Sequence, residues 1–567
     1  MVKVIKTLIF LLSNLGYWEL FRRKTKIHPC FFPSLTIALQ ISSLIAGGFL
    51  NILYETAIFL LILGLFLLLK AVKTDKNLRF LKNYICPAYI ILALCMGIML
   101  WYVKGKHFVG SDNFSHWALV VKIMLKTNHF PNFTDKIIIF ETYPLGSSSY
   151  IYYFSKFVHD SEPFQMLAQI FMLVTSILPI FFYAKKNKAI TVLIIVLFTT
   201  LVFAYNTPVY DLTVDTLLPL VSMCGLFYIF QYCTVKKENA AFFLSAAYMI
   251  EMIHIKNSGI LFLVIGVIWI LFHAKRNGSL SERLLVSGIP LFSFYLWQKH
   301  YQYVFPLANL SYHAMSIQNY KRNLDLKSPE FIHEILTSYK ELLLNFKDIW
   351  LIFLFFAVLG ILTLILFREK TKVWAILFFV SLIIFITYVV GEACMYLFSM
   401  PSSEAEDLPS IYRYTRTILI MILYLETLYC VYLIGNTDAK KPAALILSLF
   451  TIGFIVYFAK LTHISYKYNP SILADRLWLE NAKRDFEVSN EETYCILTME
   501  NNGYLEVFGR YLFESRDVIS KSITSQSDLV DLFGKYIIIK DQDNQLIKDW
   551  VQENYPQQYG YTVIRRY

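Results

Sequence analysis

Four ionisable side chains that could carry chemistry lie in one stretch between apolar segments. Asp112, His116 and Lys122 follow one another in GSDNFSHWALVVKIML, and Glu141 opens ETYPLGSSSYIYYF. A carboxylate can accept the proton of a hydroxyl group, which is a weak nucleophile until a positioned base does so. A carboxylate beside water could equally serve a transporter. Asp112 could also simply cap the amphipathic helix that the following apolar residues predict.

Two further acids, Asp211 and Asp215, lie in TPVYDLTVDTLLP at the mouth of an apolar run. Asp215 follows Asp211 at helical spacing (i,i+4) and lies one turn further inside. Burying an acid at a membrane boundary costs desolvation energy, which makes Asp215 the more suggestive of the two. The alternative is that Asp215 is an exposed interfacial residue or a helix cap.

Three cations could stabilise a phosphate leaving group, which needs positive charge nearby. Lys256 lies in IHIKNSGI at a predicted tight turn, and Arg413 and Arg416 flank Tyr414 in SIYRYTRT. The alternative for each is that its basic head anchors a helix end at the lipid headgroups.

Two other polar features have simpler interpretations. His116 has no second histidine at helical spacing, so we expect it to order its loop rather than bind a metal. The acidic run of Glu404, Glu406 and Asp407 is most simply a solvated loop.

The elements that position these residues are membrane helices. The chain is 57% apolar and 17% aromatic, and only 16% of its residues are charged, where a soluble domain usually has about a quarter. Apolar runs that approach the roughly 20 residues needed to cross a bilayer recur along it. We expect about thirteen transmembrane helices, or fourteen if the N-terminal segment, which lacks a cleavage site, also spans. The predicted spans are 31–50, 52–70, 84–103, 163–184, 190–206, 213–233, 240–255, 257–273, 284–304, 349–367, 373–391, 416–435 and 442–460.

The basic residues give a topology. The net charge of +11 comes mainly from short Lys and Arg clusters between the spans, which argues against a nucleic-acid partner. If the loop at 22–26 is cytoplasmic, strict alternation makes every further cytoplasmic loop basic, as the positive-inside rule requires. These loops are 70–82, 185–188, 236–237, 275–283, 368–372 and 440–441. The segments 104–162, 305–348, 392–415 and the tail after Lys460 then face outward.

The tail has a different character. Short strand-like runs at 493–500, 535–540 and 561–566 alternate with charged helical stretches, which predicts a small α/β domain. We therefore expect an all-α polytopic membrane domain at 1–460, with its first outer loop at 104–162, and an extracytoplasmic α/β domain at 461–567. The eight cysteines are scattered and indicate neither a disulfide framework nor a zinc site.

The DxxSHW start at Asp112 and the YPxG turn at 143–146 resemble the first outer loop of bacterial glycosyltransferases with the GT-C fold. That family usually has a second acid and a second proline, where this chain has Asn113 and Leu145. The resemblance implies a GT-C-like bundle that moves a sugar from a polyprenyl-phosphate donor to an acceptor. It also implies that Asp112 is the general base or a ligand of a divalent metal, Mg²⁺ or Mn²⁺.

We therefore predict a multi-pass glycosyltransferase of the plasma membrane that uses a polyprenyl-phosphate sugar and a glycan, lipid or protein acceptor. The alternatives are a transporter or flippase of lipid-linked glycans, which should have charged residues deep in several spans, and a non-catalytic envelope assembly factor. The candidate catalytic residues are Asp112, Asp215 and Asp211, and the candidate substrate-binding residues are His116, Lys122, Glu141, Tyr143, Lys256, Arg413, Tyr414 and Arg416.

Overall fold

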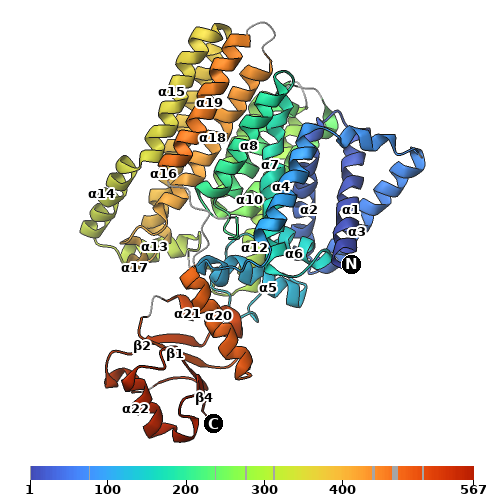
Figure 1. Ribbon diagram of the computed structural model, residues 1–567. Helices are drawn as coiled ribbons and strands as arrows, with labels where there is room; N and C mark the ends of the chain where they lie inside the picture. Colours follow the sequence, from blue (N-terminus) through green and yellow to red (C-terminus); the bar gives the residue numbers. More distant parts are fainter. Residues whose placement is uncertain are drawn as a thin grey trace. The chain divides into compact units, whose positions relative to one another are not determined.

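The chain forms two compact units, one of them built from separate pieces of the sequence (Figure 1). The first unit comprises Met1–Lys106, Thr127–Phe130 and Glu141–Tyr466, and the second comprises His107–Lys126, Pro131–Phe140 and Lys467–Tyr567. The second unit thus includes much of the predicted first outer loop besides the tail. The computed structural model describes residues 2–75, 77–207, 209–235, 238–274, 278–310, 313–436, 441–462, 470–500, 503–530 and 532–566.

The first unit is a helical bundle. Among the described residues, ten helices are long and apolar enough to cross a membrane, which supports a multi-pass membrane protein. They include the N-terminal helix α1 (Val2–Lys24), and three shorter apolar helices coincide with further predicted spans. The predicted span 284–304 falls in α12 (Leu280–Val304), which is not among the ten because polar residues such as Gln298 and Lys299 lower its hydropathy. Of the predicted cytoplasmic cations, Lys76, Lys236, Lys237, Lys275, Arg276 and Lys440 lie outside the described residues.

The remaining helices of this unit include the other predicted spans and shorter segments between them. They are α2 (Phe32–Phe49), α3 (Leu53–Thr74), α4 (Pro87–Val103), α6 (Gly146–Phe157), α7 (Glu162–Ile177), α8 (Lys188–Tyr205), α9 (Leu217–Phe230), α10 (Asn239–Ile255), α11 (Ile260–His273), α13 (Ile317–Asp325), α14 (Pro329–Asn345), α15 (Lys347–Leu366), α16 (Thr371–Cys394), α17 (Ser402–Ala405), α18 (Ile411–Gly435) and α19 (Lys441–Leu461).

Helices α7, α9, α10 and α18 form the interior of this bundle and position its polar residues. A tight turn at Asn257–Gly259 joins α10 to α11, and the Gly259 N–H donates to the Lys256 carbonyl (2.8 Å). A Cβ on Gly259 would collide with the Met252 carbonyl, so the turn requires glycine. Lys256 is therefore held at the end of α10 in extended conformation.

Helices α1 and α3 pack closely because small residues face each other. A Cβ on Gly64 would collide with the Ser13 hydroxyl and backbone carbonyl, so the two backbones approach at this point. The Ser13 hydroxyl donates to the Leu61 carbonyl (2.9 Å), and the Tyr17 hydroxyl donates to the Leu60 carbonyl (2.7 Å). Satisfied polar contacts of this kind suit a surface from which water is excluded.

The tail portion of the second unit is an α/β fold, as predicted. Its sheet has the order β2-β1-β3-β4, with parallel pairing except between β3 and β4. The register aligns Tyr494 with Val518 and with Tyr536. The elements are α20 (Pro470–Asp485), β1 (Tyr494–Thr498), α21 (Tyr504–Phe513), β2 (Val518–Ser522), β3 (Tyr536–Ile539), α22 (Gln545–Asn554) and β4 (Val563–Arg565).

The edge strand β2 is the element that the sequence analysis missed. Its residues VISKS include one buried side chain, Val518, and the others are half-exposed. An edge strand needs little apolar surface, so its hydrophobic pattern is weak. The three predicted strands, by contrast, correspond to β1, β3 and β4, whose isoleucines and valines are largely buried.

Replacing Gly64 by valine should separate α1 from α3. Overpacking of this kind costs about 1–3 kcal/mol, so the thermal unfolding midpoint of the detergent-solubilised protein should fall by several degrees. Gly97→Val in α4 is the matched control, because a Cβ there meets nothing within 4 Å. Equal midpoints for the two variants would contradict this packing.

Candidate functional site

The Asp112 motif begins a short helical segment in the second unit. Helical backbone starts at Ser111, and a π-helical turn at Asn113–Trp117 precedes α5 (Ala118–Thr127). Asp112 itself has helical dihedral angles (φ −62°, ψ −27°), and among the described residues its half-buried carboxylate makes no capping hydrogen bond. The structure therefore does not favour the helix-cap interpretation. Single π-turns occur often at functional sites.

His116 lies one turn further along and is 2% exposed. Its ring meets the rings of Trp117 and Phe140 edge-on, with centroids 4.7 and 5.9 Å away. Burial lowers the pKa of His116 to about 3, so the imidazole is neutral at physiological pH. A neutral ring packed between aromatic side chains fits the predicted role of ordering the loop.

Lys122, a predicted substrate-binding residue, contacts α21. Its ammonium group donates to the Tyr511 carbonyl (2.7 Å), lies 3.1 Å from the Glu514 carboxylate and sits over the Tyr511 ring. Lys126 pairs with the same carboxylate (2.6 Å). Burial raises the pKa of Glu514, but the two lysines outweigh that effect and hold the pKa below its usual value. These contacts suit a lysine that holds α5 against α21.

Arg476 of α20 is a central residue of this unit that the sequence analysis did not identify. Its side chain is 5% exposed, pairs with Glu480 (2.8 Å) and donates to the Phe108 carbonyl (2.6 Å). The guanidinium also lies over the rings of Phe114 and Phe508. The stretch that carries Asp112 is thus fixed by residues more than 350 positions away in sequence, and no local pattern signals such a partner.

In the first unit, Asp211 shapes the turn that leads to Asp215. Its carboxylate accepts a hydrogen bond from the Thr213 N–H (3.0 Å). The side-chain amide of Gln169 donates to the carbonyls of Asp211 and Thr213 (2.9 and 3.0 Å). Because this carboxylate organises backbone, the geometry suits Asp211 to a positioning role.

Asp215 lies just before α9 and brings two predicted cations together. One carboxylate oxygen lies 2.6 Å from the Lys256 ammonium, and the other lies 3.5 Å from the Arg413 guanidinium. Both cations also lie over the ring of Tyr414, at 4.5 and 5.3 Å from its centroid. We call Asp215, Lys256, Arg413 and Tyr414 the cationic cluster. Its members come from three segments more than 40 positions apart.

The electrostatics of the cationic cluster favour an anionic ligand. The side chain of Asp215 is 3% exposed, whereas those of Lys256 and Arg413 are 18% and 28% exposed. Burial raises the pKa of Asp215, but the charges of Lys256 and Arg413 outweigh burial and hold the pKa below its usual value. Two cations therefore share one ionised carboxylate, which is a weak base and suits a positioning role better than proton abstraction.

Arg416 lies one turn beyond Arg413 on α18 and has its own acid. Its guanidinium is 3.0 Å from the carboxylate of Asp348, which also accepts a hydrogen bond from the Tyr205 hydroxyl (2.9 Å). Arg416 also lies over the Tyr205 ring (5.0 Å). Asp348 and Tyr205 were not predicted, because each falls at the end of an apolar helix where a polar residue is unremarkable in sequence.

The predicted binding residues Glu141 and Tyr143 begin the YPLG turn. Glu141 is half-buried, and the Tyr143 hydroxyl lies 3.1 Å from Nδ1 of His313. The Nε2 of His313 lies 2.8 Å from the carboxylate of Glu404. Glu404, which was predicted to belong to a solvated loop, is 32% exposed and has His313 as a specific partner.

The predicted metal, with Asp112 as its candidate ligand, stays a prediction from the GT-C resemblance. Across the described residues, no three His, Cys, Asp or Glu side chains form a group that could hold a metal ion. The residue after Asp112, where a second acid would be expected, is Asn113. We therefore derive no chemical step through a metal.

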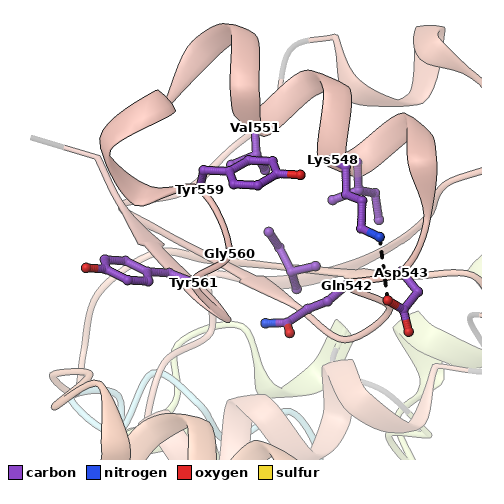
Figure 2. Close-up of a pocket in the computed structure, with 9 residues that line it drawn as sticks. Gln542, Asp543, Lys548, Val551, Tyr559, Gly560 and Tyr561 are labelled. Carbon is purple, nitrogen blue, oxygen red and sulfur yellow. Dashed lines mark ion pairs between the residues drawn. The ribbon is translucent and has the colours of Figure 1, made fainter.

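Figure 2 shows a hollow in the second unit beside α22, lined by an apolar floor and by polar side chains at its edge. Lys548 and Asp543 form an ion pair there (3.5 Å). The nine lining residues include none of the predicted site residues; they are Ile539, Gln542, Asp543, Ile547, Lys548, Val551, Tyr559, Gly560 and Tyr561.

Comparisons of the chain with protein-family models, with curated proteins and with solved structures find no significant match. The GT-C resemblance thus depends on the residues of the chain itself.

Removing the charge of Asp215 should destabilise the first unit. In Asp215→Asn, Lys256 and Arg413 repel each other without compensation, at a cost of about 1–3 kcal/mol after allowance for their partial exposure. The folded-state pKa lies below the unfolded value of about 3.9, so this contribution is full above that pH. It is lost as the pH falls through the folded value. Thermal unfolding at pH 7 measures it, and the difference from wild type should narrow below about pH 4.

The control for this variant is Asp211→Asn, which removes a neighbouring charge, keeps an oxygen that can accept from the Thr213 N–H, and leaves both ion pairs intact. An Asp215→Asn midpoint equal to that of wild type at pH 7 would contradict the electrostatic account of the cationic cluster.

Because His116 is neutral in the folded state, stability should also depend on pH between about 3 and 6.5. The unfolded imidazole binds a proton near pH 6.5, whereas the folded one does so only near about 3. The unfolded state therefore binds more protons between these values, and stability should fall by up to about 1.4 kcal/mol per pH unit below 6.5. Denaturant unfolding of wild type and His116→Phe at pH 7 and pH 5 tests this.

The variant should lose less stability than wild type between these two pH values. His333→Phe, at an exposed position of α14, controls for the loss of an ordinary histidine. A wild-type loss equal to that of His116→Phe would show that the buried ring does not contribute.

Proposed function

We propose that this protein is a membrane glycosyltransferase that takes a sugar from a polyprenyl-phosphate donor and adds it to a glycan, lipid or protein acceptor. The observation that carries the proposal is the cationic cluster. Lys256 and Arg413 both pair with the Asp215 carboxylate, and their side chains are 18% and 28% exposed. A phosphate that leaves with an extra electron pair is stabilised by cations that are already in place.

Contacts within the first unit fix the cluster. Asp215 pairs with both cations, and both lie over the Tyr414 ring. The Asn206 amide donates to the Arg413 carbonyl (3.0 Å), which fixes the start of α18. Preorganised charge costs no reorganisation when the bond to phosphate breaks, and this is the main electrostatic contribution that a transferase can make.

A surface suited to the lipid tail of the donor lies on α16, whose end contacts α18. Thr415 of α18 donates to the carboxylate of Glu392 at the end of α16 (3.2 Å). Most of the apolar face of α16 is exposed, including Phe379, Ile383 and Ile386. An apolar helix surface in contact with the bilayer could accept a polyprenyl chain while its phosphate reaches the cations.

The role of Asp112 as general base is a prediction from the GT-C resemblance. Asp112 belongs to the second unit, and the cationic cluster belongs to the first. Asp112 is half-buried and directly precedes the π-helical turn Asn113–Trp117. We also propose that the protein acts in the plasma membrane, with the second unit on the outer side.

A transporter or flippase is the second candidate, and buried acids favour it. Glu251 of α10 is 3% exposed, and Glu426 of α18 is fully buried. Both carboxylate oxygens of Glu426 lack a hydrogen-bond partner among the described residues. Acids inside membrane helices often mark ion or substrate paths. If Glu426→Gln abolishes lipid-linked sugar movement across vesicles while no sugar transfer occurs, this candidate replaces the transferase.

The transferase proposal predicts that Lys256→Gln weakens use of the donor. Loss of one charged hydrogen bond to phosphate costs about 1.5–3 kcal/mol, so kcat/KM for labelled polyprenyl-phosphate sugars should fall about tenfold or more. The measurement uses membranes with matched expression of wild type, Lys256→Gln and the control Lys340→Gln, an exposed lysine of α14. Asp112→Asn in the same series tests the predicted base, and its loss of transfer would support that role.

No transfer by wild type across a broad donor panel would contradict the proposed function. Sugar transfer by Lys256→Gln at the wild-type rate would show that the cationic cluster does not contribute to the proposed function.

A further inference from the structure

Three segments that are far apart in sequence meet through one chain of hydrogen bonds. The Tyr143 hydroxyl lies 3.1 Å from Nδ1 of His313, and Nε2 of His313 lies 2.8 Å from the Glu404 carboxylate. The three residues come from 104–162, 305–348 and 392–415, which the loop charges predict to share one face. We call them the Tyr-His-Glu chain.

The Glu404 carboxylate determines which ring nitrogen of His313 carries the proton. A carboxylate can only accept, so Glu404 favours the tautomer with the proton on Nε2. Nδ1 then carries the lone pair and accepts the hydrogen bond of the Tyr143 hydroxyl. A phenol that donates to an imidazole, which is itself oriented by a carboxylate, is arranged as an activated acid–base group.

The chain is held in place at both ends. Gly146 of the YPLG turn packs so closely that a Cβ would lie 2.6 Å from the His254 carbonyl, and the Thr142 carbonyl accepts from the Trp297 indole (3.3 Å). Beside Glu404, Ala405 is fully buried in a cluster with Tyr396 and Ile411. His313 adopts a left-handed backbone (φ 55°), which costs a non-glycine residue about 1 kcal/mol or more.

The same contacts connect the chain to the cationic cluster. His254, against which Gly146 packs, is two residues before Lys256. Tyr414, which lies beneath Lys256 and Arg413, packs against the cluster that contains Ala405. A proton-accepting group and a phosphate-suited group are thus carried by segments of the first unit that contact one another.

We infer that the Tyr-His-Glu chain is the proton acceptor for the acceptor hydroxyl, with Tyr143 as the residue that contacts the acceptor. The inference rests on the proposed function, and it assigns to Tyr143 the proton that the GT-C resemblance assigns to Asp112. The acceptor oxygen bonds to the anomeric carbon while the bond from that carbon to phosphate breaks, and the phosphate leaves with the electron pair. The acceptor proton passes to the Tyr143 oxygen as the phenol proton passes to Nδ1 of His313. Glu404 stabilises the resulting imidazolium, and release of the proton to water restores the chain.

The ordinary structural alternative is that these hydrogen bonds only tie three loops together. It predicts that removing any member lowers stability and that a small diffusible base has no effect. The side chains of His313 and Glu404 are 15% and 32% exposed, so a small molecule from solution can reach the space that a truncated His313 leaves.

The test measures kcat and KM for sugar transfer by the full-length protein in proteoliposomes, with and without added imidazole. Tyr143→Phe and His313→Ala should each lower kcat about a hundredfold, with donor KM changed less than about threefold. Imidazole should restore part of the activity of His313→Ala and none of that of Tyr143→Phe. Glu404→Gln should lower kcat less, and Glu404→Asp should retain more activity than Glu404→Gln. His333→Ala and Glu406→Gln, at exposed positions, should leave kcat unchanged.

Wild-type kcat in His313→Ala would overturn the inference and leave the proposed function standing. A loss in His313→Ala that imidazole does not rescue would overturn it in favour of the structural alternative, and thermal unfolding of His313→Gln would then show the lost stability. Absence of transfer by wild type with every donor would overturn the inference and the proposed function together.

Discussion

A carboxylate buried in a helical bundle is stable in its charged form only where cations compensate it. Asp215 meets this condition because it pairs with Lys256 in the turn after α10 and with Arg413 at the start of α18. The three segments are therefore fixed with respect to one another by charge, whereas most of the bundle is fixed by apolar packing. The Asp215 ion pairs therefore fix the relative positions of these three segments within the bundle.

The start of α18 concentrates this effect. Arg413 and Arg416 stand one turn apart, and each is bound by an acid from a different helix end, Asp215 and Asp348. Thr415 between them reaches Glu392 of α16. Few apolar contacts could hold a helix end in such a specific orientation, and the Tyr-His-Glu chain lies on segments packed against the same region.

The sequence predicted the helical bundle well, because apolar runs of sufficient length leave few alternatives. It also singled out Asp215 in a pair of acids at helical spacing, Lys256 at a predicted tight turn, and Arg413 beside Tyr414. It did not predict that they pair with one another. Pairing between distant segments depends on how helices pack, which local periodicity does not encode.

The same limit explains the residues that were missed. Asp348 and His313 have no neighbouring motif, and each acquires a partner only when helices distant in sequence come together. The second unit illustrates it further, because Lys122 and Tyr511 are 389 positions apart. A boundary drawn where composition changes, near residue 460, cannot show that a loop 350 positions earlier folds with the tail.

That shared unit has a consequence for biosynthesis. Phe114 packs on Phe508, and the buried guanidinium of Arg476 covers both rings. A ribosome makes the chain from its N-terminus, so the segment with Asp112 leaves the ribosome long before its partners exist. Until the tail is translated, this segment lacks the residues that complete its hydrophobic core, so it cannot reach its folded structure. The DxxSHW motif therefore reaches its final form among the last events of folding, after nearly every helix of the bundle has been made.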